Sequence, residues 1–297
     1  MTDQRTSPAV APVTARQTWR TLEPVHGMIY FVPEGPDRYA RLGVHAGRMG
    51  YFASRSAALG IVPAEAVVAT FFNFEPGLVR HAIPAVWDIV TPAQMLAARM
   101  EAADLALRRI LGDLLAGPEM AEAATLARRA AEAACERPEG RPLFAAHAAL
   151  PWPDDPHLVL WHAQTLLREF RGDAHVAALV TEDLSGIEAL VTHAASGDVP
   201  AEVLRTSRAW SQDAWDGTVE ALRGRGLLSP GADIAFTAAG ETQRRQVEDR
   251  TDRAAAHAYG PLGEDGCERL RHLVRPFSRA VVASGALSPP ADQGPAS

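Results

Sequence analysis

The sequence feature that most constrains the fold is a near repeat of nine residues. Residues 57–65 read AALGIVPAE and residues 194–202 read AASGDVPAE, so seven of the nine positions agree at an offset of 137. An alanine-rich chain can produce such a match by chance, but two copies this far apart indicate a duplicated domain rather than a short-period repeat. Duplicated domains usually pack about a pseudo-twofold axis, and the seam between them is a natural place for a pocket.

Composition is that of a globular protein in a reducing compartment. The chain has 297 residues, of which 47% are hydrophobic and 22% charged, and this size allows one to three domains. We expect no membrane partner, because no apolar run reaches the roughly 18–20 residues that cross a bilayer and no secretory signal opens the chain. The two cysteines, Cys135 and Cys267, are too few for a disulfide scaffold, which favours a cytoplasmic location.

The basic residues are unusual, because all 29 of them are arginine and none is lysine. A Schiff-base lysine and a phosphate-loop lysine are therefore excluded. The net charge of −7 opposes tight binding to nucleic acid unless a basic patch is segregated on one face. We found no motif that identifies a cofactor, so the cofactor is left as unknown.

Local patterns predict a mainly α fold with two tandem winged helix-turn-helix-like domains. Thr91 opens a capping box, and Ser211 and Thr237 are suited to cap two later helices. Residues 227–237 read as strand, turn and strand, which predicts a short β-hairpin wing. The helix that begins near residue 157 is expected to break at Gly172. The predicted plan is a disordered tail at 1–14, a first copy at 15–90, connecting helices and a linker at 91–150, a second copy at 151–285 and a disordered tail at 286–297.

The chain resembles known families at two levels, in one local stretch and over nearly its whole length. Residues 219–228, followed by residues 236–241, resemble the MarR-type winged helix, in which the recognition helix ends in an arginine-glycine-leucine corner and the wing returns into a threonine-capped helix. The chain from about residue 15 to 286 resembles a poorly characterised family of actinobacterial winged-helix-like proteins. Its marks are residues 22–27, 72–76, 150–153 and 167–175. The resemblance implies the fold and no particular activity, so function has to be argued from residues.

The helix that would read DNA in such a fold has unsuitable chemistry. It begins at Gln212 and carries Asp213, Asp216 and Glu220, and three carboxylates would be repelled by phosphates. The equivalent stretch of the first copy, residues 67–78, is aromatic and acidic. DNA is therefore predicted to be an unlikely partner, and a small molecule is the expected one.

Polar residues gather near the helix starts of the two copies. In the first, Glu23, His26 and Tyr30 are spaced to share one side of a helix. In the second, charged residues crowd around Gly172. If the two sets face each other across the seam, a histidine supplies acid–base chemistry and an arginine clamps an anionic group. The predicted catalytic residues are His26, Tyr30, Asp173 and His175, and the predicted ligand-binding residues are Trp19, Glu23, Phe71, Phe72, Asn73, Phe74, Trp161, Glu169 and Arg171.

Two alternatives for the site residues and two for the function stay open. His26, His175 and one carboxylate also fit a three-ligand metal site, although we predict no metal. Glu169 with Arg168 or Arg171 also fits a structural ion-pair network. The sequence thus predicts a small-molecule-binding protein, whose site also suits a cofactor-independent acid–base enzyme, as a monomer or homodimer. The alternatives are a ligand-responsive, MarR-like DNA-binding regulator and a protein-interaction module.

Overall fold

The fold is mainly α, as predicted. A computed structural model describes residues 10–45 and 47–287, and within them the regular structure is helical except for one isolated β-bridge. The α-helices are α1 (Pro12–Gly27), α2 (Glu34–Arg41), α3 (Gly47–Ser56), α4 (Ala64–Thr70), α5 (Pro76–Ala82), α6 (Pro92–Leu111), α7 (Pro118–Ala134), α8 (Pro142–Ala148), α9 (Pro156–Thr181), α10 (Gly186–Ala195), α11 (Ala201–Ser207), α12 (Gln212–Gly224), α13 (Ala238–Ala256) and α14 (Gly263–Ala283). Two short 3₁₀ turns matter below, η1 (Met28–Tyr30) and η2 (Ala57–Leu59).

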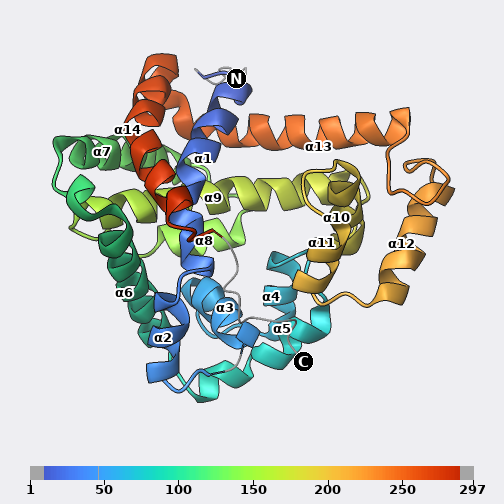
Figure 1. Ribbon diagram of the computed structural model, residues 1–297, viewed down its shortest axis with the longest axis horizontal. Coiled ribbons are helices and arrows are strands. Elements are labelled where there is room, and N and C mark those ends of the chain that lie inside the picture. The colour runs from blue at the N-terminus through green and yellow to red at the C-terminus, as the bar shows by residue number, and fades with distance from the viewer. Residues whose placement is uncertain (1–9, 46, 288–297) are drawn as a thin grey trace, which may run out of the picture.

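Helix α9 is the axis around which the rest is built. It runs across the middle of the molecule, with α13 alongside it and α7, α8 and α1 packed against it (Figure 1). Most of its residues are buried, which is expected of a helix with apolar side chains on several faces. The predicted break at Gly172 is wrong, because α9 continues through it for 26 residues. A helical glycine costs only about 1 kcal/mol, and burying neighbours such as Phe170 and Ala174 outweighs that cost.

Three hydrophobic clusters form the core. The largest surrounds α9 and includes side chains of α1, α6, α7 and α14; the second is built mainly from α3 to α6, and the third joins the end of α9 to α10, α12 and α13. Helices α1 and α14, from opposite ends of the chain, pack against each other. The largest cluster therefore draws on helices from the start, the middle and the end of the chain, a pairing that helical periodicity does not reveal.

The two copies of the repeat adopt the same local conformation. Gly60 and Gly197 have φ values of 74° and 78°, a left-handed conformation that favours glycine. Pro63 and Pro200 then stand at the N-caps of α4 and α11, each with φ of −56°. Both helices are seven residues long. We call α3 with η2, α4 and α5 the first unit, and α10, α11 and α12 the second unit.

Helix caps follow the prediction and the wing does not. Thr91 forms a complete capping box, and the side chains of Ser211 and Thr237 accept hydrogen bonds from backbone N–H groups of their helices. The predicted wing strands are wrong, because the described residues give only an antiparallel bridge between Leu228 and Phe236. Pro230 has no N–H to extend the ladder beyond that bridge.

The loops of the two units contact each other. The indole Nε1–H of Trp210 donates to the carbonyl oxygen of Asn73 at 3.0 Å, and the backbone N–H of Glu75 donates to the carbonyl oxygen of Arg208 at 3.0 Å. Gly186, the first residue of α10, packs directly against the backbone of Phe72. A Cβ built on Gly186 would lie 1.9 Å from the carbonyl oxygen of Phe72. Only glycine fits this position without displacing backbone.

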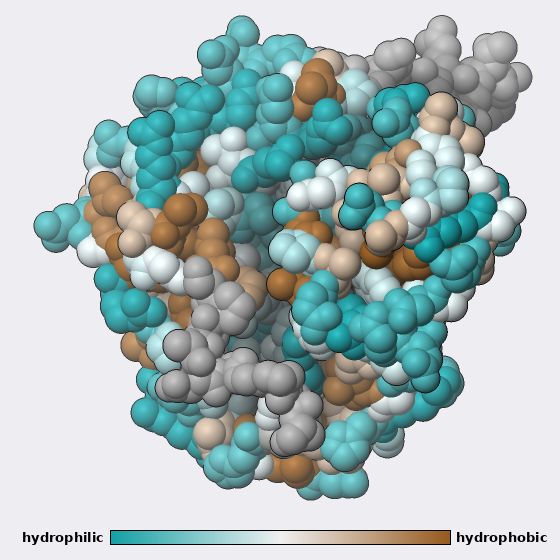
Figure 2. All heavy atoms as spheres, turned by 45° about the vertical axis from the view of Figure 1, so that its right-hand side comes forward, coloured by the Kyte–Doolittle hydropathy of each residue, from teal (hydrophilic) through white to brown (hydrophobic). Residues whose placement is uncertain are grey.

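A membrane span sets requirements on the length and composition of a helix. Within residues 10–45 and 47–287, no one helix is both long and apolar enough, and one bent pair, Gly47–Leu59 with Ala64–Thr70 at 95°, meets the length and composition limits. Figure 2 shows one face, which is mostly hydrophilic, is hollowed along its middle and carries separate hydrophobic patches. Single exposed apolar side chains are normal on protein surfaces.

Candidate ligand-binding site

Tyr30, in η1 directly after α1, lies at the meeting point of three arginines from three helices. The guanidinium carbons of Arg55 of α3, Arg99 of α6 and Arg168 of α9 lie 5.5, 5.5 and 5.3 Å from the centre of its ring. An arginine over an aromatic face is attracted by the ring quadrupole. Three cations around one ring nevertheless repel each other, so the site needs negative charge.

Tyr51 of α3 provides a second aromatic ring. Its centroid is 5.6 Å from that of Tyr30, and its hydroxyl accepts a 2.8 Å hydrogen bond from Arg55. Arg48, one helical turn earlier, lies 5.9 Å from its ring centre. Burial raises the pKa of Tyr51, but the charges of Arg55 and other arginines lower it further, so the net shift is downward. The surroundings of this phenol therefore favour negative charge.

Two carboxylates partly neutralise the arginines. Glu169 of α9 lies 3.0 Å from Arg55 and 3.0 Å from Arg168, and Glu23 of α1 lies 2.9 Å from Arg168. Burial raises the pKa of Glu169, but Arg55 and Arg168 outweigh this effect and bring it to about 2. The ion pair between Glu169 and Arg168 that the sequence left open is present, but it does not balance all the arginines.

Within the described residues, several buried polar atoms beside Tyr30 have no hydrogen-bond partner. The ring of His26 is fully buried, stacks on Trp161 at 5.5 Å and meets Tyr30 at 5.6 Å. Neither of its nitrogens is paired, and the same holds for Nε1 of Trp161, Nη1 of Arg99 and Nε of Arg55. Burial and the nearby arginines hold the pKa of His26 well below 6.5. We call this set the Tyr30 cluster; its members are Tyr30, Tyr51, Arg48, Arg55, Arg99, Arg168, Glu23, Glu169, His26 and Trp161.

Other predicted site residues belong to a separate network. Arg171 pairs with Asp252 of α13 at 2.7 Å and its guanidinium lies 4.8 Å from the ring of Trp19. The carboxylate of Asp173 accepts a 2.9 Å hydrogen bond from the backbone N–H of Phe144. Burial raises the pKa of Asp173 to about 6. These contacts join α9 to α13, α1 and α8, which is a structural arrangement.

His26 and His175 are not brought together. His26 stacks on Trp161, whereas His175 is fourteen residues further along α9, or about 21 Å at 1.5 Å per residue. Nδ1 of His175 lies 3.0 Å from Oγ1 of Thr251. The two histidines therefore cannot share one metal ion or act on one bound group.

The aromatic segment contributes less than predicted. Phe71 and Phe74 are buried in the second hydrophobic cluster, and only Phe71 is in cation–π contact with Arg55, at 4.6 Å. Phe72 packs against the third cluster, and Asn73 uses its backbone carbonyl to contact the second unit. Of these four, Phe71 borders the Tyr30 cluster through Arg55, and Phe74 borders it through the ring of Tyr51 at 5.6 Å.

Sequence reasoning missed four members of the cluster. Arg48, Tyr51 and Arg55 are spaced three and four residues apart, so they share one side of α3. Arg99 is buried within α6 at only 3% exposure among alanines and Met95. A charged residue on the apolar face of a helix is the signal that could have identified Arg99.

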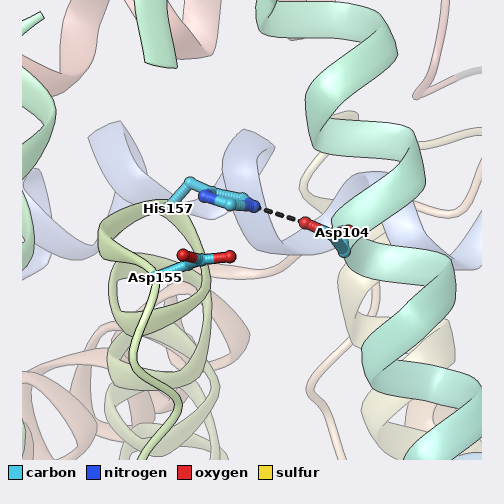
Figure 3. Close-up of side chains that lie close together, drawn as sticks. All are labelled: Asp104, Asp155 and His157. Carbon is cyan, nitrogen blue, oxygen red and sulfur yellow. Dashed lines mark hydrogen bonds and ion pairs between the residues drawn. The ribbon is translucent and has the colours of Figure 1, made fainter. Parts of the chain in front are cut away.

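A second group of potential ligands is already neutralised. Asp104, Asp155 and His157 have ligand atoms within 4.8 Å of each other, and Nε2 of His157 is 2.6 Å from Asp104 (Figure 3). Arg108 pairs with both carboxylates, at 2.8 and 3.0 Å. Burial raises the pKa of Asp104, but hydrogen bonds from His157 and Arg108 lower it further. Because Arg108 supplies the positive charge, the group is explained without a metal.

A cavity of about 290 Å³ lies on the second unit, away from the Tyr30 cluster. Its charged side chains are largely engaged with each other, since Arg205 pairs with Glu202 and Arg223 pairs with Glu220. The residues around it are Ala201, Glu202, Arg205, Gln212, Trp215, Asp216, Val219, Glu220, Arg223, Ala232 and Ile234.

The described residues form a mainly α protein, with α-helices of 7 to 26 residues. A family model described as a helix-turn-helix family matches residues 15–288, and the chain therefore belongs to this family. No curated protein and no solved structure matches the chain.

Proposed function

We propose that this protein binds a small molecule at the Tyr30 cluster. The observation that carries the proposal is the convergence of buried, unpartnered polar atoms on His26, Trp161 and Arg99. Each such atom costs about 1–3 kcal/mol when it is left unsatisfied. Buried polar groups without partners are rare in native proteins, and several in one place favour a site that a ligand completes.

We propose that a ligand enters beside Glu23 and Arg168. Their side chains are 30% and 24% exposed, whereas His26 behind them is fully buried. Aromatic surfaces combined with a few polar groups are typical of small-molecule sites.

Acid–base chemistry without a cofactor is the reaction class that such a site suits. His26 is neutral at pH 7 because its pKa is lowered, so it is able to accept a proton or donate a hydrogen bond. The hydroxyl of Tyr51 beside Arg55 is the second candidate proton donor. Tyr30 is surrounded by cations, which would stabilise an anionic intermediate.

Native mass spectrometry of the purified protein tests this proposal. We expect a retained small molecule on the wild-type chain and its loss in His26→Phe, which keeps a flat ring but removes both nitrogens. His272→Phe, at an exposed position on α14, is the control and should retain the ligand. If His26→Phe folds and binds as the wild type does, the site is wrongly placed.

A second candidate is a ligand-responsive, MarR-like DNA-binding regulator, and family membership favours it. In such proteins the helix equivalent to α12 enters the major groove. Against this, the exposed residues of α12 include Asp213, Asp216 and Glu220. A gel shift with DNA from upstream of its own gene, over a series of salt concentrations, distinguishes the two candidates, because specific binding with a steep salt slope supports the regulator.

We also propose that the two units are copies of one ancestral helix-turn-helix module. The matched φ values at Gly60 and Gly197 and the equal lengths of α4 and α11 support this. A cytoplasmic monomer or homodimer is the form we propose, with a small molecule rather than a membrane as the partner.

A further inference from the structure

We infer that the ligand of the Tyr30 cluster is a multivalent anion and that Arg208, in the turn between α11 and α12, is one of its binding residues. Ligand binding would then hold the turn of the second unit against the rest of the protein. This inference rests on the proposed small-molecule site and adds the class of ligand and its coupling to the helix-turn-helix unit.

The charges of the site require an anion. Four arginines, Arg48, Arg55, Arg99 and Arg168, surround Tyr30 and Tyr51, and Arg208 is the fifth arginine of this region. Two carboxylates, those of Glu23 and Glu169, face them. Among the described residues, three positive charges are thus left without an acidic partner, and an uncompensated charge is costly where it is buried.

Arg208 borders the same aromatic group. Its guanidinium lies 5.1 Å from the ring of Phe74, and that ring is 5.6 Å from Tyr51. Its Nη1 donates to Oγ of Ser207 at 2.7 Å, but its buried Nε has no partner. Arg208 forms no ion pair among the described residues. Its free donor therefore suits an external acceptor.

The pKa of Arg208 agrees with this placement. Burial lowers it, the phenol of Tyr51 raises it, and the positive charges of Arg48, Arg55 and Arg168 lower it again. These charges belong to the Tyr30 cluster, which shows that Arg208 experiences the same electrostatic field. An anion bound between Arg208 and Arg55 would offset the repulsion between the arginines and so raise the pKa of Arg208 again.

The backbone of Arg208 already ties the second unit to the first. Its carbonyl accepts the N–H of Glu75 at 3.0 Å, and two residues later Trp210 donates to the carbonyl of Asn73 at 3.0 Å. An anion held by both Arg208 and Arg55 would add a third tie across the same junction. A ligand that binds better to the docked state shifts the equilibrium toward it.

Arginine is well suited to phosphate and carboxylate groups, because its planar fork binds two oxygens at once. The expected ligand therefore carries several anionic oxygens. These oxygens belong either to a phosphate ester or to a polycarboxylate. Pyrophosphate and citrate are suitable probes for the two, with sodium chloride at matched ionic strength as the control for screening.

The test uses the full chain and four proteins: wild type, Arg208→Ala, Arg208→Lys and the control Arg205→Ala. Arg205 lies three residues earlier on α11, where its guanidinium pairs with Glu202 and donates to the carbonyl oxygen of Trp210 at 3.2 Å. Affinity for pyrophosphate and citrate is measured by calorimetry, and hydrogen exchange of residues 201–212 is followed with and without the probe.

We expect the wild type to bind at least one probe, and Arg208→Ala to bind it about 10- to 100-fold more weakly. Arg208→Lys should recover part of the affinity, Arg205→Ala should match the wild type, and the probe should slow exchange in residues 201–212 only when position 208 is basic. Equal binding by wild type and Arg208→Ala overturns the role of Arg208. Failure of the wild type to bind either probe at millimolar concentration overturns the anion class. Neither result removes the small-molecule site, which the native mass spectra of His26→Phe test separately.

Discussion

The indole of Trp210 donates a hydrogen bond to the backbone carbonyl of Asn73, and these two residues are 137 positions apart. The same offset relates the two copies of the nine-residue repeat. In a twofold interface, equivalent residues meet each other only where the axis passes between them. A contact between Trp210 and Asn73 is therefore what a twofold junction of the two proposed copies would show.

Loss of this hydrogen bond should weaken the junction. Trp210→Phe keeps an aromatic ring but removes the Nε1 donor, so we expect the free energy of unfolding to fall by about 0.5–1.5 kcal/mol in urea titrations. Trp87→Phe is the matched control, because the buried Nε1 of Trp87 has no partner to lose. An equal loss in both variants would show that ring size, not the hydrogen bond, matters.

Gly186 should tolerate no side chain. Gly186→Ala places a methyl group against the backbone of Phe72, so we expect a loss of about 1–3 kcal/mol or more. Gly217→Ala in the interior of α12 meets no atom within 4 Å and should stabilise the protein by about 0.5–1 kcal/mol. Chemical unfolding of the two variants checks the contrast, and a neutral Gly186→Ala would mean that the two units are not held this closely.

Stability should fall as the pH drops from 6.5 toward 4. Burial lowers the pKa of His147 and His162 to about 4 each, so the unfolded chain binds their protons first. Near pH 5 each histidine therefore lowers the free energy of unfolding by about 2 kcal/mol. Asp173 acts in the opposite direction, since its pKa is raised to about 6 and its stabilising contribution is present at low pH and is lost as the pH rises through 6.

Two variants separate these opposite effects. His162→Leu should flatten the dependence of stability on pH between 6.5 and 4, because it removes one group that resists protonation. Asp173→Asn should make it steeper, while its amide oxygen can still accept from the N–H of Phe144. Urea midpoints at pH 7 and near pH 5 measure both slopes, and an unchanged slope in either variant contradicts the assignment for that residue.

The sequence was most informative where structure is decided locally. The caps at Thr91, Ser211 and Thr237 depend on residues within one helical turn, and all three were predicted correctly. The continuity of α9 through Gly172 depends on burial by helices distant in sequence, so a glycine signal read alone gave the wrong answer.

The candidate site was only partly accessible to sequence reasoning. The structure places His26 against Tyr30 and Trp161, and Glu169 beside Arg168; of these contacts, helical spacing had indicated the one between His26 and Tyr30. Their partners Arg55 and Arg99 come from α3 and α6, and no local pattern states that these helices meet α9. Assembly of the cluster is a tertiary event, and that is why the prediction paired His26 with the distant His175 instead.

We predict that the acidic side chains of α12 weaken the binding of DNA. The triple variant Asp213→Asn, Asp216→Asn and Glu220→Gln removes three exposed negative charges and frees Arg223 from its pairing with Glu220. We expect affinity for a random DNA duplex at low salt to rise at least about tenfold, with a steeper dependence on salt, because more counterions are released. Fluorescence anisotropy over a salt series measures both quantities. Tight, salt-sensitive binding of the wild type to DNA from upstream of its own gene would contradict this reasoning and would favour the regulator, since the carboxylates would then be compatible with the groove.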